Sequence, residues 1–224
     1  MLLGTDNQGR TAWHAATASN ISVTLQNIWQ CAKEILTSEE LHKLLLGTDN
    51  EGMTALHLAA YRGTLETLQK VWQCGKERIK KEELNKLLLR TDHQGKTAWH
   101  AAAASEISVI LQNLWIFAKE ILKTEELKKL VLGTDNRGMT AFQLAARWGT
   151  SEKLQNIWQC AKEALTTEEL NKLLLCTDNE GMNAWNLAAT SSNSETLQTV
   201  WQCAKEILTK EELNKLDLVQ TFRE

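Results

Sequence analysis

The chain has 224 residues, of which 43% are hydrophobic, and its 25 lysines and arginines nearly balance its 28 aspartates and glutamates. The net charge of −3 lacks the basic excess that is typical of nucleic-acid-binding proteins, so no nucleic-acid partner is expected. No apolar run approaches the roughly 18 residues that a membrane helix needs, and the first residues lack the features of a secretory signal. The composition favours a cytoplasmic protein with no membrane partner.

A short phrase returns along the chain every 43 residues, as TDNQG at Thr5, TDNEG at Thr48, TDHQG at Thr91, TDNRG at Thr134 and TDNEG at Thr177. Such a period is the signature of a solenoid, in which each unit buries its apolar face against its neighbours. The period predicts a single solenoid over residues 1–224. Its repeats are 5–47, 48–90, 91–133, 134–176 and 177–219, and residues 217–224 are expected to form a C-terminal cap.

The second repeat shows how each unit is expected to begin. Asp49 and Gly52 are turn formers, which predicts a tight hairpin. Thr54 is a suitable N-cap for a short helix over residues 55–61. Gly63 is expected to end this helix as a C-terminal glycine.

Two further helices are expected in each unit. The first is long and amphipathic, because apolar residues recur at helical spacing at Leu68, Val71, Trp72, Gly75 and Ile79. A third helix follows at once. Threonine and glutamate form a predicted capping box at its start in three units, as Thr37 with Glu40, Thr166 with Glu169 and Thr209 with Glu212. The expected fold is an all-α repeat solenoid with three helices per repeat.

Four cysteines share one position of the repeat, where the middle unit has a phenylalanine: Cys31, Cys74, Cys160 and Cys203, with Phe117. Stacked helices lie about 8–10 Å apart, whereas a disulfide needs Cα atoms within about 7 Å. These thiols are therefore expected to be buried and reduced, which fits a cytosolic protein.

The segment TDNEGMTALHLAAYRG, from Thr48 to Gly63, resembles the ankyrin repeat, whose pattern is DxxGxTPLHxAAxxG, and the resemblance recurs in all five units. The proline of that pattern is alanine here, and each unit is about ten residues longer than the usual repeat. HEAT and armadillo repeats have a similar length but lack a TDNxG hairpin. The resemblance implies an ankyrin-like solenoid with stacked helices, short hairpin loops and one added helix per repeat.

In the ankyrin family, partners usually meet the hairpin tips and the exposed end of the first helix. The resemblance therefore implies protein-binding positions at Arg10, Met53, Tyr61, Arg62, Lys96, Arg137, Met139, Arg147 and Trp148. Across the whole set of equivalent positions, five basic residues face two acidic ones, Glu51 and Glu180. This balance favours an acidic or polar protein segment as the partner.

Trp148 differs from the other eight tryptophans, which occupy two apolar positions of the repeat and are expected in the core. Its own position is polar in the other four units, so Trp148 is expected to be exposed, where tryptophan commonly anchors interfaces. An indole lying flat on a neighbour is the alternative. Stacking of about 8–10 Å per unit would place Arg147 and Trp148 roughly 20 Å from Tyr61 and Arg62, the reach of about six extended residues.

Motifs that suggest catalysis have simpler explanations. The phrase GTDNQGRT resembles a phosphate loop, but it carries an aspartate and recurs in every unit. His14, His57 and His100 share a position that becomes Gln143 and Asn186, which a metal site or general base would not tolerate. The ankyrin resemblance implies that these side chains join adjacent loops by hydrogen bonds. No enzyme activity, cofactor or metal is expected.

The leading hypothesis is a non-enzymatic protein-protein interaction module, a scaffold that binds a protein segment on its concave face of hairpins and first helices. Two alternatives stay open: a structural spacer within a longer repeat array, and a secreted microbial effector. An engineered origin is also open, although scattered substitutions such as Arg90 and Cys176 resemble natural drift. No N-terminal cap is visible in the sequence. This leaves open both a longer array and self-association through the uncapped N-terminal repeat.

Overall fold

The computed structural model describes residues 2–105, 107–191 and 193–218, and its regular structure in these ranges is α-helical, with fifteen helices and one isolated bridge between Thr134 and Thr140. Each repeat contributes three helices, as the sequence predicts. The first helices of the repeats are α1 (Ala12–Ala18), α4 (Ala55–Arg62), α7 (Ala98–Ala104), α10 (Ala141–Trp148) and α13 (Ala184–Thr190). The long helices are α2 (Ser22–Ile35), α5 (Leu65–Arg78), α8 (Ser108–Ile121), α11 (Ser151–Ala164) and α14 (Ser194–Ile207). The third helices are α3 (Ser38–Leu46), α6 (Lys81–Leu89), α9 (Thr124–Leu132), α12 (Thr167–Leu175) and α15 (Lys210–Leu218).

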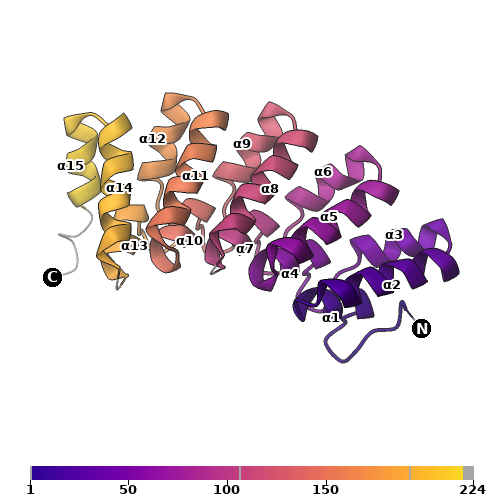
Figure 1. Cartoon of the computed structure of the whole chain (residues 1–224). Helices are drawn as coiled ribbons and strands as arrows, with labels where there is room; N and C mark the ends of the chain where they lie inside the picture. The colour runs from indigo at the N-terminus through magenta and orange to yellow at the C-terminus, as the bar shows by residue number, and fades with distance from the viewer. Residues whose placement is uncertain (1, 106, 192, 219–224) are drawn as a thin grey trace. The chain divides into compact units, whose positions relative to one another are not determined.

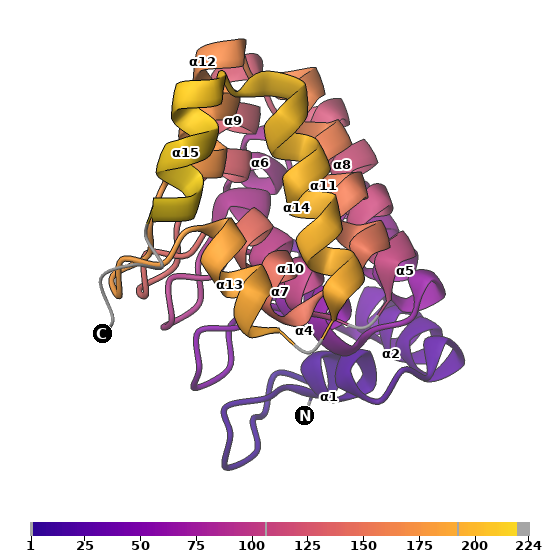
Figure 2. The ribbon, with the colours of Figure 1, turned by 90° about the vertical axis from the view of Figure 1, so that its left-hand side faces the viewer.

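The helices form two compact units, residues 1–122 and 123–224, and each unit is described by itself. In the first unit, α4 packs between α1 and α7, and α5 packs between α2 and α8 (Figure 1). In the second unit, α10 packs on α13 and α11 packs on α14 (Figure 2). Within each unit, the first helices of consecutive repeats are therefore neighbours, and so are the long helices. A single solenoid over all five repeats stays a prediction.

Local hydrogen bonds explain where the helices begin. The Thr54 side chain accepts from the backbone N–H of His57, as expected for the N-cap of α4. At α3 and α12 the predicted capping boxes are present, and Thr209 and Glu212 exchange the same bonds before α15. These contacts confirm the predicted starts of the third helices.

Gly63 ends α4 as the sequence predicts, and it does so with an extended backbone. Its φ of −74° and ψ of 160° are extended values that any residue adopts. A Cβ atom at this position would lie 2.2 Å from the backbone oxygen of Ala59. Glycine is required here because the backbone approaches closely, and Gly149 repeats this arrangement after α10, with its Cβ position 2.5 Å from the Ala145 oxygen.

The predicted core is confirmed in the inner repeats and only partly in the outer ones. Six of the eight predicted core tryptophans are buried, whereas Trp185 and Trp201 are half-buried. Cys74, Cys160 and Cys203 are buried, but Cys31 is exposed, so its predicted burial is wrong. These three exceptions lie in the first and last of the described repeats. All five cysteines are free thiols.

Candidate functional site

Each repeat begins with a hairpin that is organised by its aspartate. In the second repeat, Asp49 Oδ1 accepts hydrogen bonds of 2.9 Å from the backbone N–H groups of Glu51 and Met53. Gly52 adopts a φ of +77°, a left-handed conformation that glycine allows without strain. The same bonds and positive φ recur at the other four hairpins, so the phrase TDNxG is confirmed as a turn.

Backbone hydrogen bonds join neighbouring hairpins. The N–H of Asn50 donates to the carbonyl of Gln8 over 2.9 Å, and in the second unit Asn179 donates to Arg137 over the same distance. A Cβ atom on Gly9 would lie 2.3 Å from Asn50 Oδ1, which shows how closely the loops approach. Because part of the hairpin backbone is used in these bonds, a partner would meet mainly the side chains.

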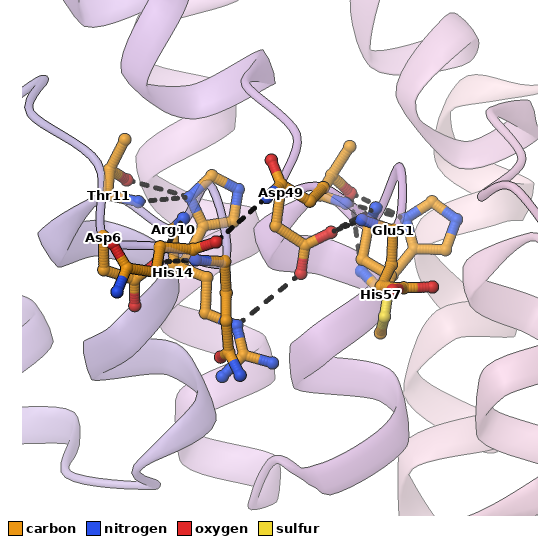
Figure 3. Close-up of polar contacts among 12 residues, drawn as sticks. Asp6, Arg10, Thr11, His14, Asp49, Glu51 and His57 are labelled. Atoms are coloured by element: carbon orange, nitrogen blue, oxygen red, sulfur yellow. Dashed lines mark hydrogen bonds and ion pairs between the residues drawn. The ribbon is translucent and has the colours of Figure 1, made fainter.

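The side chains of His14 and His57 form hydrogen bonds to the backbone of the neighbouring loops (Figure 3). The ring Nδ1 of His57 accepts from the Thr54 backbone N–H at 3.3 Å, so the proton of the neutral ring lies on Nε2. Nε2 donates to the carbonyls of Arg90 at 3.0 Å and Lys96 at 3.1 Å. His14 makes the equivalent bonds to Thr11 and to the carbonyl of Gly47. Burial lowers the pKa of both histidines.

Gln143 makes the equivalent hydrogen bonds in the fourth repeat, with an amide side chain that does not titrate. Its Oε1 accepts from the Thr140 N–H at 2.9 Å, and its Nε2 donates to the carbonyls of Cys176 and Met182, both at 3.1 Å. The predicted role of this repeat position, to join adjacent loops by hydrogen bonds, is therefore confirmed at His14, His57 and Gln143. In the last repeat Asn186 is too short, and Asn183 donates instead to the carbonyl of Leu216 at 3.4 Å.

Of the predicted binding residues at the hairpins, one is buried and another forms an ion pair with a neighbouring hairpin. Met139, a binding position implied by the ankyrin resemblance, is fully buried, so its side chain is not exposed to a partner. Arg10 Nε lies 3.7 Å from the buried carboxylate of Asp49, so this arginine is engaged in an ion pair between hairpins (Figure 3). Met53 and Lys96 are half-buried, and Arg137 is exposed.

The aromatic residues at the ends of α4 and α10 are exposed and each carries an arginine. Tyr61 is 44% exposed, and the guanidinium carbon of Arg62 lies 5.6 Å from its ring centroid. Trp148 is 49% exposed, and that of Arg147 lies 4.7 Å from the indole. These are cation–π distances. The indole is therefore exposed and paired with the residue beside it.

A shallow depression adjoins the first of these pairs. Tyr61 and Arg62 line it together with Ala104, Ser105 and Ile107, from the end of α7 and the start of α8. Ile107 is 38% exposed and was not among the predicted binding residues. The equivalent residue is threonine or asparagine in three other repeats. Comparison of equivalent repeat positions, which identified Trp148 as a binding residue, could therefore have identified Ile107 as well. Tyr61 and Trp148 belong to different units, so their predicted separation stays a prediction.

Within residues 2–105, 107–191 and 193–218, no group of three or more histidine, cysteine or acidic side chains is arranged to hold a metal ion. No helix in this described part of the chain is long and apolar enough to cross a membrane. Comparison with known proteins gives no match, either to the model of a protein family or to a curated protein sequence.

Proposed function

We propose that the chain is a non-enzymatic protein-binding module of ankyrin-like construction, which holds an acidic or polar peptide segment against its exposed aromatic–arginine pairs. The single observation that carries this proposal is that Tyr61 and Trp148, at equivalent ends of α4 and α10, are both exposed beside an arginine. Large aromatic residues and arginine are the types that most often dominate binding energy at interfaces.

The chemistry of each pair favours an acidic or polar segment. An arginine that lies over an aromatic ring keeps N–H groups at its edge, which can bind a carboxylate with two parallel hydrogen bonds. Beside Tyr61 and Arg62, the apolar side chain of Ile107 lines the same depression. A segment that combines a carboxylate with an apolar side chain fits this arrangement.

Selection of twelve-residue peptides from a random displayed library, with the wild-type chain as bait, tests the proposal. We expect the selected peptides to be rich in aspartate and glutamate. Their affinity should fall at least about 10-fold for Tyr61→Ala and for Trp148→Ala, because interface aromatics of this kind contribute about 2 kcal/mol or more.

Ile116→Ala is the matched control. Ile116 is 57% exposed but lies on the long helix α8, away from the ends of the first helices, so its loss should leave peptide affinity unchanged. Peptides with no acidic preference, or equal binding by all three variants, would refute this site.

The spacer alternative has an observation in its favour as well. One contact between consecutive repeats has a similar geometry in both units: Trp29 Nε1 donates to Glu77 Oε2 at 3.1 Å, and Trp158 Nε1 donates to Glu206 Oε2 at 2.8 Å. A spacer needs such uniform junctions and no exposed aromatic pair. The peptide selection separates the two functions, since a spacer would yield no peptide whose binding depends on Tyr61 or Trp148.

A further inference from the structure

The first long helix, α2, exposes a stripe that is covered in every later repeat. Thr24 and Cys31 are exposed and Ile28 is half-buried. The equivalent residues are buried in all four later long helices: Thr67, Val71 and Cys74; Ile110, Leu114 and Phe117; Lys153, Ile157 and Cys160; Thr196, Val200 and Cys203. The stripe thus has the composition of a junction between repeats.

The contacts between consecutive long helices inside each unit show which side chains pack against such a stripe. Trp158 Nε1 on α11 donates to Glu206 Oε2 on α14 over 2.8 Å, and Lys162 Nζ donates to the other oxygen of Glu206 over 2.8 Å. In the first unit, Lys76 and Glu120 form the equivalent ion pair. Between α11 and α14, a tryptophan and a lysine one turn apart on one long helix therefore bind a single glutamate on the next.

At the junction between α5 and α8, the equivalent tryptophan lies against the cysteine position. Trp72 on α5 stacks on Phe117 of α8 with ring centroids 4.7 Å apart and an interplanar angle of 6°. Phe117 occupies the repeat position of the cysteines. Two contacts are therefore seen at these junctions: a glutamate that accepts from an indole and a lysine between α11 and α14, and an indole stacked on the cysteine position between α5 and α8.

Both halves of this junction are displayed without a partner repeat in the described chain. On α14, Trp201 is half-buried and Lys205 exposed, at the positions of Trp158 and Lys162. On α2, Cys31 and Glu34 are exposed, at the positions of Phe117 and Glu120. The donors on α14 are thus complementary to the acceptor and the apolar stripe on α2.

We propose that two copies of this chain dock head to tail, the α14 face of one copy covering the α2 face of the next. Trp201 then covers Cys31 of the next copy, and Trp201 Nε1 and Lys205 Nζ donate to the carboxylate of Glu34. Each copy keeps one face of each kind, so the contact is heterologous and the assembly grows with concentration. The occupant is a second copy because both faces carry the same residue types as the internal junctions. This surface is separate from the aromatic–arginine pairs, and the proposal does not depend on them.

Sedimentation velocity of the wild-type chain over a wide range of concentration provides the first test. We expect the mean mass to rise with concentration beyond a dimer. Glu34→Lys or Lys205→Glu places like charges in the contact, so each variant alone should associate at least about 10-fold more weakly.

Mixing the two variants distinguishes head-to-tail docking from other contacts. An equal mixture of Glu34→Lys and Lys205→Glu pairs opposite charges at every junction, so association should return toward the wild-type strength. Glu82→Lys, an exposed charge reversal on α6, is the control and should associate like the wild type. A wild-type chain that stays monomeric at all concentrations would overturn the proposal. Association that Glu34→Lys leaves intact, or that mixing fails to restore, would also overturn it.

Discussion

At the scale of single residues, the loop-holding histidines are the groups most sensitive to pH. Burial lowers the pKa of His14 and His57 below the ordinary value of 6.5, and the neutral ring accepts a hydrogen bond at Nδ1 that a protonated ring would lose. The unfolded chain therefore binds protons more readily than the folded chain below about pH 6.5. The stability that these rings contribute is complete above that pH, and it is lost as the pH falls toward their folded-state pKa.

We expect the variant His14→Gln, His57→Gln to lose less stability than the wild type between about pH 7.5 and pH 5, since a lowering of one pKa unit corresponds to about 1.4 kcal/mol. Urea unfolding at a series of pH values measures this difference. Glutamine is the appropriate substitute because Gln143 makes the same hydrogen bonds in the fourth repeat. Identical pH profiles for the two proteins would show that the histidines do not titrate on unfolding.

The cysteines give a second prediction at this scale. Burial raises the pKa of Cys74 and of Cys203 to about 12, whereas the Cys31 side chain is exposed. Because the thiolate is the reactive form, Cys31 should react with a thiol reagent much faster than these two in the folded protein at mildly alkaline pH. Mass spectrometry of the labelled peptides measures the order. Loss of the fast phase in Cys31→Ser is expected, and rapid labelling of Cys74 would contradict the buried position.

At the scale of elements, several helices were predictable because they begin with a local capping signal. Thr54, Thr37 and Thr166 each cap a helix with residues three positions along the chain, so the sequence contains the whole interaction. Gly63 ends α4 as expected, but the close approach of the Ala59 carbonyl, which explains why glycine is needed there, is not visible in the sequence. The burial of Met139 and the pairing of Arg10 with Asp49 likewise depend on three-dimensional packing.

A glycine inside α5 provides a prediction for this scale. Gly75 lies within the helix, and its equivalents in the other four repeats are alanines, all fully buried: Ala32, Ala118, Ala161 and Ala204. A Cβ atom on Gly75 would lie 3.3 Å from the end of the Leu84 side chain, which can move, and leucine accompanies alanine at these positions in the other repeats.

We therefore expect Gly75→Ala to raise the free energy of unfolding by about 0.5–1 kcal/mol, measured by urea denaturation. Gly181→Ala is the opposite control. Its surroundings are open, but its φ of +77° is unfavourable for alanine, so this change should cost about 1 kcal/mol. Destabilisation by Gly75→Ala would show that the helix packs too tightly at this position for a methyl group.

At the scale of the whole chain, stability is expected to follow the number of neighbours that each repeat has. In such arrays, stability is approximately the sum of repeat and junction terms, so repeats with one covered face open more easily than repeats with two. The exposure of Ile21 and Cys31 in the first repeat and the partial burial of Trp201 in the last agree with this expectation. The sequence shows the period that creates these junctions and the lack of an N-terminal cap, but which side chains are left exposed is visible only in the structure.

Hydrogen exchange followed by mass spectrometry tests this expectation. In dilute solution, the amides of α2 and α14 should exchange faster than those of α5 and α11, because fewer packed side chains restrain the outer helices. At high concentration, head-to-tail docking would cover α2 and α14, so their exchange should slow while that of α5 and α11 changes little. The Glu34→Lys variant should show fast exchange in α2 at both concentrations. Uniform protection of all long helices in dilute solution would contradict the dependence of stability on neighbouring repeats, whereas concentration-independent exchange would contradict only the docking.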